Sequence, residues 1–203
     1  MGFSLEHFGF ISGRKITDAI GITQEASHKR FYIQSRAKKC SDFILKLDLN
    51  KAYDNVHWDM VRLILLQTGL PLDLMNWITA YTSIANLAVL INDVPFNFFK
   101  ISRGLWQVCP LSSIFFLFII EGLSLLIATS TKSEIIEGLS INKSLKLTHL
   151  IFVDDVLLIG SGVISTWEEF HCLLQLFCYA TGMEISQKKN ILYHGTVYDS
   201  LAG

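Results

Sequence analysis

The chain of 203 residues is 51% hydrophobic and 17% charged, and this composition excludes an intrinsically disordered protein. Its length is that of one ordinary domain with a substantial buried core. The formal net charge of −1 is not typical of a nucleic-acid-binding protein and excludes a uniformly basic surface.

Residues 14–51 nevertheless form a basic segment. It holds nine Lys/Arg against four Asp/Glu, so the segment is +5 and the rest of the chain is −6. A basic patch of this kind can contact phosphates, and a solvated helix face is the alternative interpretation. Residues 16–36 within it have loosely spaced apolar positions, which predict an amphipathic helix.

A strand is predicted over residues 43–49, where apolar residues occupy every second position. Ile44, Lys46 and Asp48 then share the face opposite the apolar one. A helix is expected next, from an N-cap at Asp54 or Asn55 to about Gln67. A second helix is expected over residues 72–81, after Gly69 and Pro71. Two strands are then predicted over residues 87–91 and 96–101, joined through Asn92, Asp93 and Pro95.

The most apolar stretch covers residues 111–128, and its eighteen residues reach the lower length limit of a membrane span. Glu121 lies near its middle, and a carboxylate near the centre of a bilayer is costly. The sequence therefore favours a buried core helix. A small membrane protein anchored by this stretch is the alternative interpretation.

A hairpin is predicted over residues 147–160, where two apolar strands are interrupted only by Asp154 and Asp155 at the expected tip. A helix is expected over residues 166–181, closed by Gly182. The sequence contains no evident repeat or linker. These elements predict one α+β unit, in which helices pack on one face of an antiparallel sheet.

The adjacent aspartates pose an electrostatic problem, because like charges held close together raise one another's pKa. A divalent metal is the usual remedy, and Mg²⁺ commonly rests on one or two carboxylates together with substrate phosphates. Asp48, at the end of a separate strand, is the candidate for a third acid. A solvated turn is the alternative interpretation of an isolated Asp-Asp pair.

Five sequence blocks occur in a fixed order over roughly residues 7–193. They are G-F-I-S-G-R-K-I-T-D at 9–18, D-L-N-K-A-Y-D-N-V-H-W at 48–58, R-G-L-W-Q-V-C-P-L-S at 103–112, F-V-D-D at 152–155 and G-M-E-I-S-Q-K-K at 182–189. With these blocks the chain resembles the reverse transcriptases of LINE-type (non-LTR) retrotransposons. The resemblance implies a polymerase palm over residues 43–203, preceded by a residual fingers segment over residues 1–42 and lacking a thumb.

The resemblance also implies the chemistry, which is RNA-directed DNA synthesis with two Mg²⁺ ions. Asp48, Asp154 and Asp155 are the implied catalytic and metal-binding carboxylates, with Asp48 and Asp154 as the direct ligands. The implied partners are an RNA template, a DNA primer and deoxynucleoside triphosphates.

Five further residues match functional positions of the family. Tyr53 matches the aromatic residue under the incoming sugar, and a core or rim tyrosine is its alternative reading. Gln107 matches a glutamine that contacts the incoming nucleotide or the template, and Lys189 matches a lysine near the phosphates. Arg14 and Lys51 are expected to contact nucleic acid, although an ordinary surface arginine would explain Arg14 equally.

The third block departs from the family pattern. Trp106, Val108 and Cys109 stand where the family has arginine, glycine and aspartate. A β-branched valine resists the backbone conformations that glycine allows, so nucleotide binding is in doubt and we expect a degenerate copy with little or no activity. In the Asp-Asp block, Val153 replaces an alanine, an exchange that we expect to be tolerated.

A non-catalytic palm remnant that binds RNA through residues 14–51 is the main alternative function. The four cysteines have no C-x-x-C spacing, and the first residues do not resemble a secretory signal. We therefore expect a protein of the cytoplasm or nucleus, not a secreted one, without stable membrane association. The sequence leaves the oligomeric state open.

Overall fold

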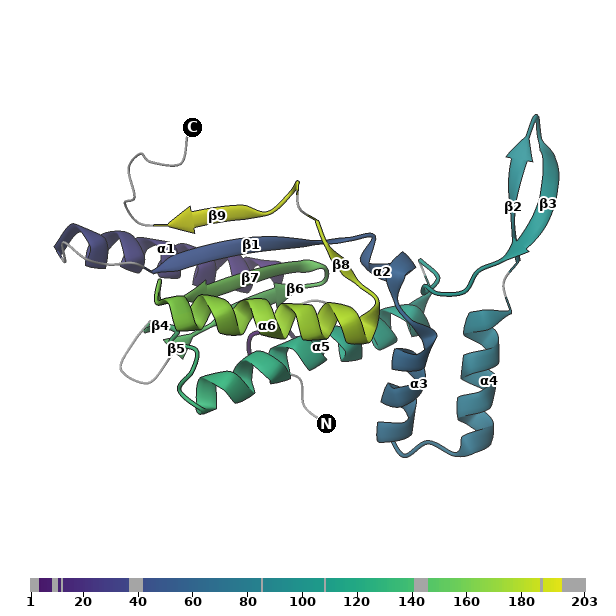
Figure 1. The fold of residues 1–203 in the computed structure, drawn as a ribbon, viewed down its shortest axis with the longest axis horizontal. Helices are drawn as coiled ribbons and strands as arrows, with labels where there is room; N and C mark the ends of the chain where they lie inside the picture. Colours follow the sequence, from purple (N-terminus) through teal and green to yellow (C-terminus); the bar gives the residue numbers. More distant parts are fainter. Residues whose placement is uncertain are drawn as a thin grey trace.

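The structure is a computed structural model and describes residues 4–8, 11, 13–36, 42–84, 86–107, 109–140, 146–186 and 188–194. Its fold is the expected α+β arrangement, built around an antiparallel sheet (Figure 1). The helices are α1 (Ile16–Arg36), α2 (Ala52–Asn55), α3 (Trp58–Gln67), α4 (Leu72–Ser83), α5 (Pro110–Lys132) and α6 (Ile164–Thr181). The strands are β1 (Phe43–Asn50), β2 (Asn86–Ile91), β3 (Val94–Lys100), β4 (Leu139–Ser140), β5 (Lys146–Leu147), β6 (His149–Phe152), β7 (Asp155–Gly160), β8 (Glu184–Ile185) and β9 (Ile191–His194).

The central sheet has the strand order β6-β7-β1-β8, and β9 also pairs with β1. Helices α5 and α6 cover one face, where Phe43 and Leu47 of β1 join the larger core (Figure 1). Helix α1 covers part of the other face, where Ala19 and Ala26 pack in a second core with Ile44. The expectation that helices pack on one face only is therefore corrected.

The alternation predicted for β1 is confirmed. Phe43, Leu47 and Leu49 are buried in the larger core, whereas Ile44 is buried in the smaller core on the opposite side. Lys46 and Asp48 follow Ile44 on that second side, beyond its apolar end, and both are partly exposed. The period of two along this strand thus brings charged side chains to one face of the sheet.

The hairpin of β6 and β7 is tighter than expected. Phe152 and Asp155 are register partners, so Val153 and Asp154 alone form the turn. Asp155 is the first residue of β7 and does not lie at the tip. Val153 has a φ of 56°, a left-handed conformation that a β-branched side chain disfavours.

The region after β1 differs from the prediction at its start. Helix α3 has His57 as its N-cap instead of Asp54 or Asn55. The Asn55 side chain donates a hydrogen bond to the backbone oxygen of Asn50 at 2.8 Å. Asp54 accepts one from the Gln107 side chain at 3.3 Å. The Asn55 side chain therefore makes a local contact and the Asp54 side chain a tertiary one, and neither caps α3. The predicted end of α3 at Gln67 is confirmed.

Strands β2 and β3 form a separate hairpin that projects beyond α4 (Figure 1). Its turn consists of Asn92 and Asp93 alone, with φ values of 50° and 62°, which suits a two-residue turn. Pro95 lies within β3 and not in the turn. Both strands expose apolar side chains, so this hairpin is not part of the main core.

Helix α5 is the central core helix. Phe116, Ile119, Ile120, Leu123 and Ile127 are fully buried. By length and composition alone this helix could cross a membrane, and it is the one helix of the described residues for which this holds. Within the fold it packs against α3, α6 and the sheet, as the core-helix interpretation predicts.

Helix α6 ends as predicted. Gly182 is its C-cap in the left-handed conformation, with φ 78°. A Cβ at this position would lie 2.7 Å from the backbone oxygen of Asn55, so the C-terminal end of α6 packs closely on the segment after α2. The short strands β4, β5, β8 and β9 were not predicted.

Candidate active site

Two carboxylates meet where β1 and β7 pair. Asp48 and Asp155 are register partners, so their side chains stand on the same face of the sheet, with Cβ atoms typically about 5 Å apart. The Asp48 side chain is 23% exposed and the Asp155 side chain 46%. Asp154 lies in the adjacent turn and is exposed. All three predicted acids thus lie at the same end of the sheet.

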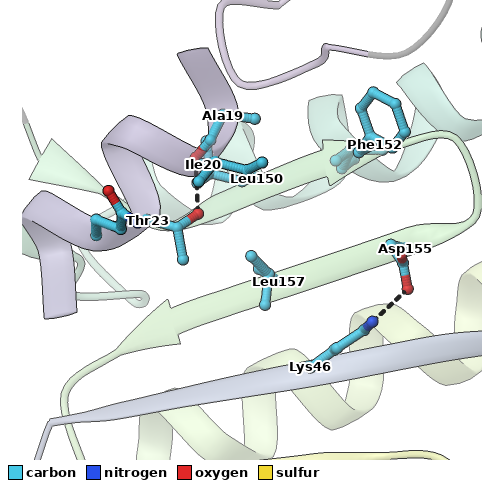
Figure 2. A pocket seen from close by; sticks show the side chains of 10 residues that line it. Ala19, Ile20, Thr23, Lys46, Leu150, Phe152, Asp155 and Leu157 are labelled. Atoms are coloured by element: carbon cyan, nitrogen blue, oxygen red, sulfur yellow. Dashed lines mark hydrogen bonds and ion pairs between the residues drawn. The ribbon is translucent and has the colours of Figure 1, made fainter. Parts of the chain in front are cut away.

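Asp155 and Asp48 each form an ion pair with a lysine. Lys46 Nζ is 2.9 Å from Asp155 Oδ1, and the two side chains point toward one another (Figure 2). Lys189 Nζ is 3.3 Å from Asp48 Oδ1. The hydrogen bond to Asp155 raises the pKa of Lys46 above its usual value, although partial burial opposes this. Both lysines supply positive charge at the carboxylates.

Tyr53 is held between the core and the aspartate turn. Its ring stacks on Phe116 of α5, with centroids 4.4 Å apart. Burial raises the pKa of the Tyr53 hydroxyl, the nearby Ser113 hydroxyl lowers it, and the negative charge of Asp154 raises it further. Tyr53 is therefore both a packed core residue and a neighbour of Asp154.

The loop that holds Gln107 docks on the segment after β1. Gly104 N donates to Val56 O at 2.8 Å, and Leu105 N donates to Tyr53 O at 2.7 Å. Gly104 has a φ of 102°, and a Cβ there would lie 2.8 Å from the backbone oxygen of Asp54. Gly104 is therefore required by this close approach. Val108 lies outside the described residues.

The two predicted nucleic-acid contacts, Arg14 and Lys51, have different surroundings. The Arg14 guanidinium donates to the backbone oxygens of Ser4 and His7, so it holds the N-terminal segment in place. Lys51 is exposed and has a φ of 45° immediately before α2. The structure places the three acids at one end of the sheet and Lys189 against Asp48, while Gln107 donates a hydrogen bond to Asp54 in the segment after β1.

Among the described residues, no three or more His, Cys, Asp or Glu side chains form a preassembled metal cluster. Asp48 and Asp155 nevertheless offer oxygen donors at neighbouring positions, with Asp154 in the adjoining turn. Mg²⁺ typically uses one or two carboxylates and completes its shell with water and phosphate. The donor set therefore fits a hard divalent ion.

Sequence reasoning missed two residues of this site. The side-chain oxygen of Asn190 accepts a hydrogen bond from Asp48 N at 3.2 Å, and no local pattern marks it. Lys46 was placed on the same face as Asp48, but its ion pair with Asp155 was not foreseen. The ion pair could have been inferred from the period of two in β1 only if the register between β1 and β7 had been known.

A cavity of about 270 Å³ lies beside the carboxylates, between α1 and the sheet (Figure 2). Ala19, Ile20 and Thr23 of α1 form one side. Leu157 of β7 contributes to the opposite side, and Lys46 and Asp155 lie at its polar end.

Comparison with known proteins gives one family and one fold. The sequence model of "Reverse transcriptase (RNA-dependent DNA polymerase)" matches residues 2–197. Among solved structures, telomerase from Candida albicans with the TWJ fragment of telomeric RNA is similar with a TM-score of 0.61 and 16% identity, over 88% of this chain and 31% of that one. Apo telomerase from Candida tropicalis, truncated from its C-terminal domain, has a TM-score of 0.60 and 13% identity, over 89% and 36%. The chain thus spans about a third of these structures, and the likeness shows a shared fold.

Proposed function

Because this chain belongs to the reverse transcriptase family, we propose that it is the palm region of a LINE-type enzyme that copies RNA into DNA. The LINE assignment rests on the five sequence blocks, above all D-L-N-K-A-Y-D-N-V-H-W at residues 48–58 and F-V-D-D at residues 152–155. Residues 1–42 belong, in this proposal, to the fingers, and residues 43–203 to the palm.

The observation that carries the proposal is the pairing of Asp48 with Asp155 beside the Asp154 turn. Asp48 and Asp154 are the proposed ligands of two Mg²⁺ ions, with Asp155 beside them. When bound, the ions supply activation of a primer 3′ hydroxyl and charge stabilisation at the leaving pyrophosphate. The chain's own contribution is positioning, since β1 and β7 fix Asp48 and Asp155 on the sheet and the two-residue turn between β6 and β7 holds Asp154 beside them.

Three other residues receive roles in the same proposal. Tyr53 is fixed by its stack on Phe116 and lies near Asp154, which suits a residue that packs under the incoming sugar. Lys189 places an ammonium group 3.3 Å from Asp48 Oδ1, where it can move onto the triphosphate. Gln107 contacts the nucleotide or template from the docked loop.

Basic residues outside this cluster contact the nucleic acid in the same proposal. Lys51 is exposed next to the Tyr53 segment and is proposed to bind a phosphate. Arg14 is proposed to bind the template side, while its hydrogen bonds to Ser4 and His7 fix its position.

The altered loop limits the reaction of this copy. Trp106, 38% exposed, stands where the family has an arginine, and Cys109 stands where the family has an aspartate. These changes remove one positive and one negative charge beside Gln107. Phosphoryl transfer depends on positioning, so we propose that synthesis by this copy is slight or absent.

The test combines metal binding with synthesis. Mn²⁺ binding is measured by the decrease of the electron paramagnetic resonance signal of the free ion. We expect the unmodified chain to bind Mn²⁺ and the Asp48→Asn variant not to bind it. Incorporation of labelled deoxynucleotide on a primed RNA template with Mg²⁺ is expected to be slight, with Asp154→Asn as the control.

Two outcomes would contradict parts of the proposal. Robust incorporation that disappears in Asp154→Asn would show an active enzyme and refute the assignment as a degenerate copy. Salt-sensitive RNA binding without Mn²⁺ binding or incorporation would refute the metal site and favour a non-catalytic RNA-binding remnant.

A further inference from the structure

Lys46 is built into the sheet beside the carboxylates. It lies in the middle of β1, and its register partner on β7 is Leu157, two residues from Asp155. Its ammonium group reaches diagonally to Asp155 Oδ1 at 2.9 Å (Figure 2). The Lys46 side chain is 38% exposed and also lines the cavity under α1. Both ends of this ion pair therefore start from a rigid pair of strands.

Lys189 makes a looser contact with the other carboxylate. Its side chain is 69% exposed, and it lies in a turn between β8 and β9. Its distances to Asp48 Oδ1 and Oδ2 are 3.3 Å and 3.5 Å, longer than the 2.9 Å of the Lys46 pair. An exposed lysine on a turn can leave its partner at little cost, whereas Lys46 is anchored on β1.

The three carboxylates therefore differ in how firmly a lysine ammonium group is paired with each of them. Like-charged groups at one end of a sheet repel one another, and one fixed ammonium group compensates one of them. Lys46 compensates Asp155, the carboxylate opposite Asp48. Among the described residues, Asp48 forms its ion pair with the displaceable Lys189 and feels Lys46 only as a second, unbonded charge, and Asp154 lies in the exposed turn. Two carboxylates thus stay available for a cation, and the third is paired with the ammonium group of Lys46.

We propose that Lys46 is a positioning residue, which holds Asp155 in an ion pair and so keeps it out of the set of direct metal ligands. This inference rests on the proposed function, because it assigns separate roles to the three acids of that site. Lys46 does not contact the substrate in this proposal. It acts through Asp155, and it leaves Asp48 and Asp154 as the metal-binding pair.

The experiment measures the dissociation constant of Mn²⁺ by electron paramagnetic resonance at low ionic strength. Lys46→Met removes the charge and keeps the length of the side chain, and we expect Mn²⁺ to bind about tenfold more tightly because Asp155 becomes a ligand and a repelling charge is lost. Lys46→Arg keeps the ion pair and is expected to stay within about twofold of the unmodified chain.

A second background separates positioning from simple charge repulsion. In Asp155→Asn no carboxylate can be released, so Lys46→Met is expected to change the Mn²⁺ dissociation constant by at most about threefold, through the long-range charge alone. An equal change in both backgrounds would overturn the inference, as would an unchanged dissociation constant in Lys46→Met. Lys46→Gln serves as a second neutral variant, and circular dichroism confirms that each variant is folded.

Failure of the inference and failure of the proposed function give different results. If the unmodified chain binds Mn²⁺, and Asp48→Asn abolishes this binding while Lys46 variants leave it unchanged, only the role of Lys46 is refuted. If the unmodified chain does not bind Mn²⁺ at millimolar concentration, the metal site of the proposed function is refuted, and the role of Lys46 with it.

Discussion

Val153 carries local backbone strain in the turn before Asp155. Its φ of 56° is a left-handed conformation, which costs a side chain with a Cβ about 1–2 kcal/mol relative to glycine. The side chain also packs partly against the larger core, and this contact offsets some of the cost. Valine was expected to be tolerated at this position because the local sequence does not reveal the sign of φ.

We predict that Val153→Gly raises the free energy of unfolding by roughly 0.5–1 kcal/mol, the relief of strain minus the lost packing and the greater freedom of the unfolded chain. Urea denaturation measures the change. Val94→Gly is the matched control, because Val94 is exposed in β3 and has no positive φ, so its replacement should destabilise the protein. A loss of stability in both variants would refute strain at Val153.

His149 of β6 is a buried histidine in the core. It is 1% exposed, its Nε2 lies 2.6 Å from Ser124 Oγ, and its Nδ1 lies 2.9 Å from Thr148 Oγ1. Burial lowers the pKa of His149 from 6.5 to about 4, which the charge of Glu121 only partly opposes. The folded protein therefore keeps this imidazole neutral at a pH where the unfolded chain binds a proton.

We predict that acid destabilises the protein between pH 6.5 and pH 4. In this window the unfolded state binds more protons at His149, so stability is full above pH 6.5 and falls as the pH is lowered, by about 3 kcal/mol at pH 4. Urea unfolding at several pH values measures the slope. His149→Gln cannot titrate and is expected to flatten the curve, and an unchanged slope in this variant would assign the effect to other groups.

Single residues of the candidate site were predictable where they stand in a sequence motif. Contacts that depend on the register between two strands were missed. Asp48, Asp154 and Tyr53 stand in recognisable blocks, and the structure places them at one end of the sheet. The contacts of Asn190 with Asp48 and of Lys46 with Asp155 depend on how distant strands align. A single sequence does not contain that alignment.

Among the elements, the C-terminal end of α6 gives a sharp test of close packing. Gly182 and Gly69 both have positive φ, 78° and 70°. A Cβ at Gly182 would lie 2.7 Å from Asn55 O, whereas a Cβ at Gly69 would meet nothing within 4 Å. The two glycines therefore share the backbone conformation and differ only in their surroundings.

We predict that Gly69→Ala lowers the free energy of unfolding by about 1 kcal/mol and Gly182→Ala by about 3 kcal/mol, since only the second adds a steric clash to the left-handed strain. Thermal and urea denaturation measure both. Equal losses in the two variants would mean that the segment at Asn55 moves freely to accommodate the new methyl group.

The long elements were predictable because their periods are strong. Alternation marked β1, a long continuous apolar run marked α5, and apolar spacing marked α6. The N-cap of α3 was misassigned because Asp54 and Asn55 bond to the neighbouring segments instead of the helix. Strands β8 and β9 escaped prediction because they are short and take their form from pairing with β1.

For the whole molecule, the β2–β3 hairpin is a prominent exposed apolar feature of the described residues. Its side chains Leu87, Val89, Leu90, Ile91, Val94, Phe96, Phe98 and Phe99 are each at least 41% exposed. Both strands also present unpaired edges, and exposed apolar edges favour association. The hairpin should therefore control solubility more than stability.

We predict that Phe96→Ser with Phe98→Ser reduces self-association at micromolar concentration and changes the free energy of unfolding by less than about 0.5 kcal/mol, because the two phenylalanines are 61% and 71% exposed. Sedimentation velocity and urea denaturation are the measurements. Ile164→Ser with Tyr179→Ser is the control, since it removes exposed apolar surface from α6 instead. Equal effects of both pairs would refute a special role of the hairpin.

The central place of β1 in the sheet also sets the order in which the carboxylate cluster can form during synthesis. Asp48 emerges early, but its partner strand begins at Asp155, and the Asn190 side chain that binds its backbone lies 142 residues downstream. Until the ribosome has released that distant segment, β1 lacks the strands that pair with it in the folded sheet, and its edges are exposed. A nascent chain stalled before β7 should therefore bind a chaperone, and the face that carries the carboxylates is among the last parts of the domain to fold.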